Sequence, residues 1–308
     1  MTPPTQVKTK PQYRAWWQWL SDRTPHIYAV SFLFLSAIVL RQPLTSLVNL
    51  SLRDELASHV LVIPFISGIL IYMGRERIFS SPRFCPAVGL PLLVLAVALG
   101  IGLQSRVANL SPSDHLSVIM ALIVTGWIGA FILFYGATAF RAAAFPLLFL
   151  FLMSPLPVVV SANLISLLQR GSAGVCYGLF HLIGVPVTRS GFRFALPGIE
   201  IEVAEQCSGI HAGLSLFIAG LLAEHVLLGS LWKKACFTLF IFPIAIFKNA
   251  VRIVTIAWLG IHVSPNYFHG PLHRQGGLPF SLLALALMAA LLWLLRRPER
   301  LSMVRPPS

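Results

Sequence analysis

The sequence predicts an all-α polytopic membrane protein with about eight transmembrane helices, and three observations predict this class. Of the 308 residues, 56% are hydrophobic and 11% are charged. The mean hydropathy is +0.80. A soluble domain usually carries about twice that charged fraction. Apolar runs long enough to cross a bilayer also recur along the chain. We therefore expect lipid, rather than water, to surround most of the chain.

Eight apolar runs are candidate spans, because a bilayer core needs about 20 apolar residues per helix. They are Ile27–Val48, His59–Met73, Ala87–Leu103, Leu116–Tyr135, Ala142–Val160, Gly209–Leu228, Ala235–Ile261 and Leu278–Leu295. The second run is short, and Arg41, Gln42 and Pro43 weaken the outer end of the first. The polar segment before it ends without a small-residue cleavage site, which predicts an uncleaved first span. We expect residues 27–297 to form the membrane domain between the tails 1–26 and 298–308.

The basic residues indicate how the chain is oriented. Its net charge is +13, which in a soluble protein would suggest nucleic acid as a partner. Here the basic residues lie in short loops between apolar runs, as the positive-inside rule describes. With the N-terminus inside, 14 of the 23 Lys and Arg residues fall on the cytoplasmic side. We therefore predict two cytoplasmic termini and no nucleic-acid partner.

The segment from 161 to 208 then lies on the external side of the membrane. Its first half, 163–183, has apolar residues at helical spacing that are interrupted by polar ones, which favours an interfacial or re-entrant helix over a span. Its second half, 191–204, alternates apolar and polar residues around Leu-Pro-Gly at 196–198. This pattern predicts a short β-hairpin just before the sixth span.

Cys207 follows that hairpin, where a strand becomes a helix. The N–H groups and the dipole at a helix N-terminus favour a thiolate there. Two other interpretations remain: a small buried hydrophobic residue, or a disulfide with the external Cys176. The spacing of the four cysteines (Cys85, Cys176, Cys207 and Cys236) fits neither CxxC nor a zinc pattern. We expect no metal and no cofactor.

Two further groups of polar residues lie at the same predicted face. Lys248 and Arg252 share a helix face in the outer half of the seventh span, with Asn249 beside it. A guanidinium there can simply extend to the membrane surface, or it can bind an anion in a polar cavity. His269 and His273 precede the last span, where a lone histidine is usually solvated. Together, Cys207, His273 and Arg252 would supply a nucleophile, a proton carrier and an oxyanion-stabilising group.

Three sequence blocks resemble the exosortase/archaeosortase family. They are VAEQCSGIHAGLSLF (203–217), NAVRI (249–253) and HRQGGLPF (273–280). Supporting stretches are SHVLVIPFISGILIY (58–72) and GVPVTRSGFRFALPGIEIEVAE (184–205). The resemblance extends from about residue 58 to residue 297. The first of these blocks, the cysteine block, contains an arginine in many exosortases, whereas this chain has His211-Ala212 there. This departure bears on which subfamily the chain resembles and not on the chemistry.

The resemblance implies a cysteine transpeptidase in the cell inner membrane, with its active site on the periplasmic face. Its substrates would be exported proteins with a PEP-CTERM-like tail: a Pro-Glu-Pro-like motif, an apolar helix and a basic cluster. On this resemblance Cys207 is the nucleophile, Arg252 holds the oxyanion or positions the substrate, and His273 is the acid/base, with His269 as the alternative. Supporting or substrate-binding residues would be Glu205, Lys248, Asn249 and His269.

The implied reaction passes through an acyl-enzyme thioester, which a glycan or lipid acceptor then resolves. Resolution by water would make the protein a protease. Two other classes remain open. One is a transporter with an anion site at Lys248, Asn249 and Arg252. The other is a structural factor of a polysaccharide export system, in which Cys207 is inert.

Overall fold

The computed structural model describes residues 13–107, 109–204, 209–268 and 277–304. The chain forms two compact units, Met1–Pro157 and Val158–Ser308. In the described residues, six helices are long and apolar enough to cross a membrane, or seven if one bent pair counts as a span. The structure thus supports a multi-span helical protein. It does not confirm the count of eight.

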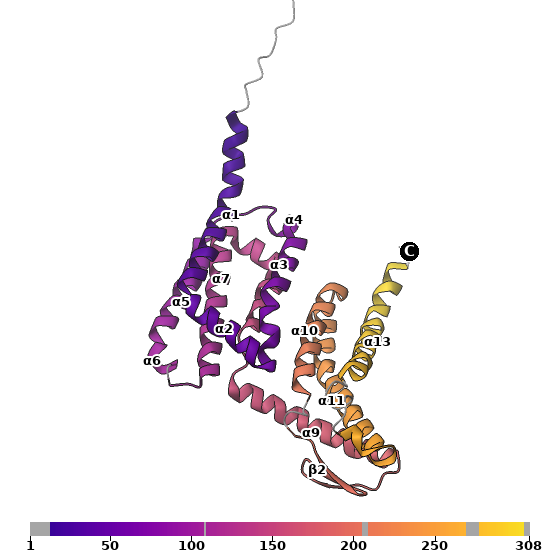
Figure 1. The fold of residues 1–308 in the computed structure, drawn as a ribbon. Coiled ribbons are helices and arrows are strands. Elements are labelled where there is room, and N and C mark those ends of the chain that lie inside the picture. Colours follow the sequence, from indigo (N-terminus) through magenta and orange to yellow (C-terminus); the bar gives the residue numbers. More distant parts are fainter. Residues whose placement is uncertain (1–12, 108, 205–208, 269–276, 305–308) are drawn as a thin grey trace, which may run out of the picture. The chain divides into compact units, whose positions relative to one another are not determined.

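The first unit is helical throughout its described part (Figure 1). Its elements are α1 (Tyr13–Val39), α2 (Arg41–Arg53), η1 (Glu55–Leu61), α3 (Ile63–Met73), α4 (Arg75–Ile78), α5 (Pro86–Gly102), α6 (Gln104–Val107), α7 (Pro112–Ala142), α8 (Ala144–Phe149) and η2 (Leu150–Met153). Helices α5 and α7 pack so closely that a Cβ on Gly89 or Gly129 would meet the backbone of the other helix. Small residues allow this approach in membrane helices.

The predicted first span is broken. Helix α1 ends at Val39, and α2 begins at Arg41 at an angle of 75° to it. The polar residues Arg41 and Gln42 favour a break here. In a continuous helix, the ring of Pro43 would also clash with the carbonyl group four residues earlier. The outer end of this span is therefore a separate helix that lies across the direction of α1.

The predicted fifth span, Ala142–Val160, is not one helix. Helices α8 and η2 together cover the ten residues Ala144–Met153, and α9 begins at Val158. Pro155 and Pro157 lie between them and lack the N–H groups that a continuous helix needs. Ser117 of α7 fixes this break, because its Oγ donates to the carbonyl oxygen of Pro155 over 2.6 Å.

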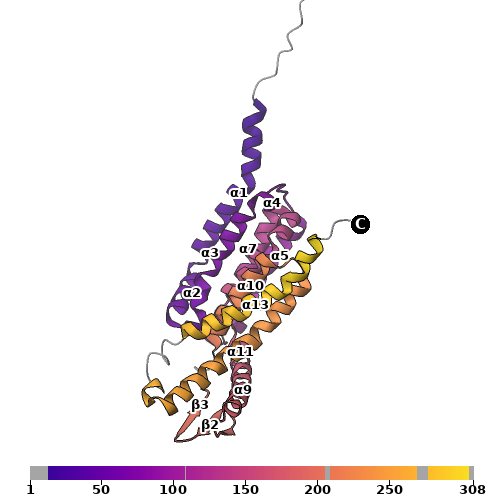
Figure 2. The same ribbon diagram turned by 90° about the vertical axis from the view of Figure 1, so that its right-hand side faces the viewer.

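The second unit combines helices with a small sheet (Figures 1 and 2). Its elements are α9 (Val158–Leu182), β1 (Thr188–Ser190), β2 (Arg193–Leu196), β3 (Ile199–Glu202), α10 (Ile210–Leu227), α11 (Leu231–His262), η4 (Pro265–Phe268) and α13 (Gly277–Val304). Helices α10, α11 and α13 enclose one apolar core, built around Phe237, Ile241 and Ala284. The predicted interfacial helix 163–183 is the longer α9, which is long and apolar enough to span.

The sheet has three antiparallel strands in the order β1-β2-β3. Strands β2 and β3 pair through Leu196 and Ile199, on either side of the turn at 197–198, as the alternating pattern predicted. Strand β1, which pairs with β2, was not predicted. Phe194 and Leu196 are buried in a core that includes α9 and α11 residues. The sheet therefore fixes the chain that leads toward Cys207.

Candidate functional site

Four of the predicted site residues lie outside the residues that the structure describes. These are Glu205, Cys207, His269 and His273. The other three, Lys248, Asn249 and Arg252, lie on α11. The chain is described on both sides of residues 205–208, and Val203 and Gly209 have defined contacts there.

The polar group on α11 is largely buried in the second unit. Lys248 is 2% exposed and Asn249 is 1% exposed, while Arg252 is half-buried. Lys248 and Arg252 are one helical turn apart, so their side chains are neighbours on one face. Buried charged and amide groups are costly in an apolar environment and are usually retained for a function. This group is therefore the polar centre of the candidate site.

Helix α9 holds Asn249 in place. The Asn249 side-chain amide (Nδ2) donates to the Ser172 hydroxyl over 3.1 Å, and both residues are buried. One turn further along α9, the Cys176 thiol donates to the carbonyl oxygen of Ala250 over 3.7 Å. Cys176 is a free, buried cysteine. The α9–α11 contact thus fixes the orientation of the amide.

Gly209 brings the start of α10 against the same amide. It is the N-cap of α10 and has φ 78° and ψ 16°, a left-handed conformation that favours glycine. A Cβ at this position would lie 3.0 Å from both Cγ and Oδ1 of Asn249. The chain can therefore turn into α10 beside Asn249 only because residue 209 has no side chain.

The chain is also fixed on the other side of the undescribed residues 205–208. The Gln169 side-chain amide (Nε2) donates to the carbonyl oxygen of Val203 over 3.0 Å in the interior. The Val203 N–H donates to the carbonyl oxygen of Phe192 over 3.0 Å. Val203 itself is buried. Helix α9 thus holds the chain before Cys207 through Gln169, and it orients Asn249, next to Gly209, through Ser172.

Gln169 and Ser172 were not among the predicted site residues. The sequence shows them only as polar interruptions of an apolar helix. The signal that could have found them is their spacing, since residues at i and i+3 share a helix face. Polar side chains that share one face of an apolar helix indicate a buried polar contact.

These observations define a multi-span membrane protein with a buried polar site where three helices meet. Over residues 49–290 the chain matches the transmembrane exosortase family, and it belongs to that family. The same comparisons find no similar protein among curated proteins and no similar solved structure. Family membership indicates a membrane-embedded sorting transpeptidase that acts on exported proteins. In the described part of the chain, no group of three His, Cys, Asp or Glu side chains could hold a metal ion.

A Gly209→Ala substitution is expected to reduce both stability and processing. Its left-handed backbone costs a non-glycine residue about 1–3 kcal/mol, and the new methyl group would also displace Asn249. Gly184→Ala is the matched control, because Gly184 has φ 74° but no atom within 4 Å of the added Cβ. Thermal unfolding in detergent and a processing assay would compare the two. Equal losses in both variants would contradict a role of the Gly209–Asn249 contact.

A Gln169→Leu substitution is expected to slow processing because it releases the chain before Cys207. It removes the donor to a buried carbonyl, which costs about 1–3 kcal/mol. Asn163→Leu is the control, because Asn163 lies on the same helix and is exposed. Limited proteolysis would locate the loosened segment, and substrate turnover would measure its effect. Unchanged turnover in Gln169→Leu would show that this hydrogen bond does not position the site.

Proposed function

We propose that this protein is a membrane-embedded cysteine transpeptidase that cleaves a C-terminal sorting signal from exported proteins. Cys207 is the nucleophile, His273 is the acid/base, with His269 as the alternative, and Arg252 stabilises the oxyanion. Glu205, Lys248 and Asn249 support the site or bind substrate. Family membership supports the class of reaction, and the arrangement around Gly209 supports the assignment of the residues.

The packing of Gly209 against Asn249 carries this proposal. Cys207 precedes Gly209 by two residues, and two residues of chain span at most about 7 Å. Arg252 follows Asn249 by three residues on α11, so it lies about one helical turn away. This connectivity supports a site in which the Cys207 sulfur acts together with the Asn249 amide and the Arg252 guanidinium. The first helical N–H groups of α10 also begin at this point, and they favour a thiolate.

The proposed reaction has two halves. The Cys207 thiolate attacks the carbonyl carbon of the scissile peptide bond, and the resulting oxyanion receives hydrogen bonds from Arg252. The C–N bond then breaks, His273 gives its proton to the leaving amine, and a thioester remains on Cys207. A nucleophile on a glycan or lipid acceptor attacks the thioester, its proton passes to His273, and the thiolate leaves. Attack by water in this second half gives hydrolysis.

The substrate's own apolar tail would align the sorting signal beside the helices, which lowers the entropic cost of reaction. The basic loops favour two cytoplasmic termini and a site on the external face, and the family resemblance implies that this is the periplasmic face of the inner membrane. Co-expression with an exported protein that has such a tail tests the function. We expect a shortened product that has lost its apolar tail, and a transient thioester on the enzyme. An uncut tail in the presence of the intact protein would refute the proposal.

A further inference from the structure

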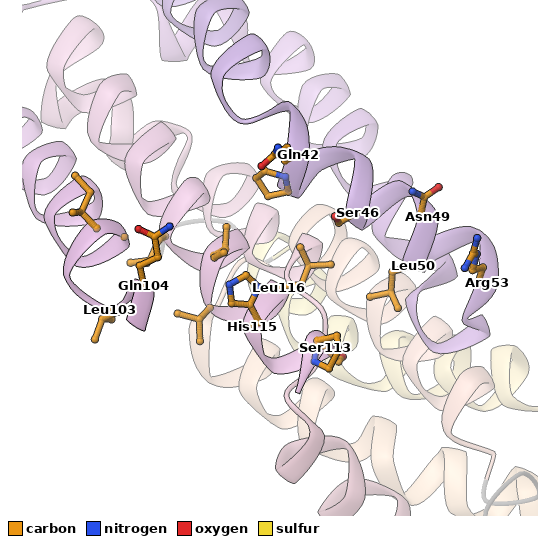
Figure 3. Close-up of a pocket in the computed structure, with 17 residues that line it drawn as sticks. Gln42, Ser46, Asn49, Leu50, Arg53, Leu103, Gln104, Ser113, His115 and Leu116 are labelled. Carbon is orange, nitrogen blue, oxygen red and sulfur yellow. The ribbon is translucent and has the colours of Figure 1, made fainter. Parts of the chain in front are cut away.

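The first unit contains a cavity of about 740 Å³ that the proposed reaction does not use (Figure 3). Helix α2 supplies one wall, and the end of α5, helix α6 and the start of α7 supply the other. Seven polar side chains line it: Gln42, Ser46, Asn49, Arg53, Gln104, Ser113 and His115. The lining residues include no carboxylate. The cavity wall therefore presents hydrogen-bond donors and positive charge.

The polar wall of α2 is a regular feature of that helix. Gln42, Ser46, Asn49 and Arg53 follow one another at intervals of four, three and four residues, so they form one stripe along the helix. The nearby carboxylates are engaged elsewhere. Asp54 accepts from the Leu56 N–H over 2.9 Å, and Asp114 accepts from the Ser111 hydroxyl over 2.8 Å. Arg53 is therefore a charged residue in a lining that contains no acidic residue.

A second cavity, of about 630 Å³, continues from the first. The two share five lining residues, namely Pro43, Gly100, Ile101, Ile119 and Leu122. The second cavity is apolar, and its two polar side chains already bond to each other, since the Trp127 indole N–H donates to the Ser36 hydroxyl over 3.1 Å. Together the cavities form one groove with a polar, positive end and an apolar course between α1, α5 and α7.

We propose that this groove binds one anionic glycerophospholipid of the surrounding bilayer. Arg53 would hold the phosphate, and the amides and hydroxyls along α2, with His115, would bind the glycerol and ester oxygens. Arginine suits a phosphate because its planar, always charged group donates several hydrogen bonds. The acyl chains would lie along the apolar course, against Leu93, Val97 and Ile101.

An amphiphile fits this groove better than an apolar protein helix does. A helix satisfies its own backbone groups and would leave the seven polar side chains without polar partners. It also has a diameter of about 10–12 Å, whereas an acyl chain can follow a narrow, bent course. The continuity of the polar and apolar ends matches a molecule that carries both kinds of surface.

The test uses the full-length protein in detergent, with phosphatidylglycerol or phosphatidylcholine added and retained lipid measured by native mass spectrometry. We expect phosphatidylglycerol to be retained in preference to phosphatidylcholine. Arg53→Gln should lower phosphatidylglycerol retention by about tenfold or more, as expected for lost hydrogen bonds to a charged group. Arg41→Gln is the control, because Arg41 is exposed on α2 and does not line the groove.

The apolar course has its own matched pair of variants. Val97→Trp should reduce retention of both lipids because the side chain fills the groove, whereas Val94→Trp on the same helix should not. Val97 and Val94 are 54% and 56% exposed, so folding should tolerate both changes equally. Three results would overturn the proposal. They are equal retention of the two lipids, equal effects of Arg53→Gln and Arg41→Gln, and binding of inorganic phosphate alone as tightly as phosphatidylglycerol. Displacement of lipid by a synthetic apolar helix without any head-group preference would also overturn it.

Discussion

Cys207→Ala is expected to abolish cleavage of the sorting signal while the protein still inserts and folds. Without the sulfur no thioester can form, and loss of a catalytic nucleophile lowers turnover by roughly 10³-fold or more. The measurement is the fraction of a co-expressed, tailed substrate that is cut, together with the amount of enzyme in the membrane. Cys207→Ser should be nearly as inactive, because a hydroxyl is far less acidic than a thiol.

Cys236→Ala and Cys85→Ala are the controls for this prediction. Both are free cysteines that are partly buried, so their loss tests a general effect of removing a thiol. We expect wild-type cleavage in both. If Cys207→Ala cleaved the substrate normally, the enzyme hypothesis would be wrong and the transporter or structural-factor hypothesis would gain support, since neither needs a reactive sulfur.

Arg252→Ala is expected to lower the rate of cleavage by about 10²–10³-fold, the usual effect of removing one oxyanion-stabilising donor. The effect should fall mainly on kcat, because the interaction is made in the transition state. Arg252→Lys should restore only part of the rate. A lysine keeps the charge but lacks the planar group with several donors that arginine presents to an oxyanion.

Arg170→Ala is the matched control for Arg252→Ala. Arg170 lies on α9 in the same unit, but its side chain is exposed. Its removal should leave kcat unchanged and should lower stability by little, as surface substitutions usually do. A full rate with Arg252→Ala, or an equal loss with Arg170→Ala, would show that Arg252 does not stabilise the reaction and that its position on α11 is only structural.

The sequence predicted the helices that depend on long apolar runs, such as α7 and α11, and it predicted the β2–β3 hairpin. It failed where proline and charge divide an apolar run. The apolar run 142–160 predicts one span, although Pro155 and Pro157 separate η2 from α9. Apolar content measures affinity for lipid, whereas the missing N–H groups of proline decide where a helix ends.

The site shows the same division between what a sequence pattern can and cannot predict. Lys248, Asn249 and Arg252 stood out because polar residues are rare within an apolar run. Gln169 and Ser172 did not, because their importance depends on which helix packs against α9. The Asn249–Ser172 hydrogen bond joins residues that are 77 positions apart, and no local pattern predicts such a partner. The left-handed backbone at Gly209 likewise depends on the position of α11.

The proposed convergence of Cys207, Arg252 and His273 is tested most directly by chemical cross-linking of Cys207 to introduced cysteines. In the parent variant, Cys85 and Cys236 are replaced by alanine. Cys176 is replaced by serine, whose hydroxyl can still donate to the Ala250 carbonyl oxygen. One further cysteine is then introduced in each variant, by Arg252→Cys, His273→Cys or Leu239→Cys. A short bifunctional thiol reagent is applied to each. Leu239 is exposed on α11, 13 residues before Arg252 and hence about 20 Å away along the helix. We expect links from Cys207 to positions 252 and 273 and none to position 239. Links to neither site position, or an equal link to position 239, would contradict a common site.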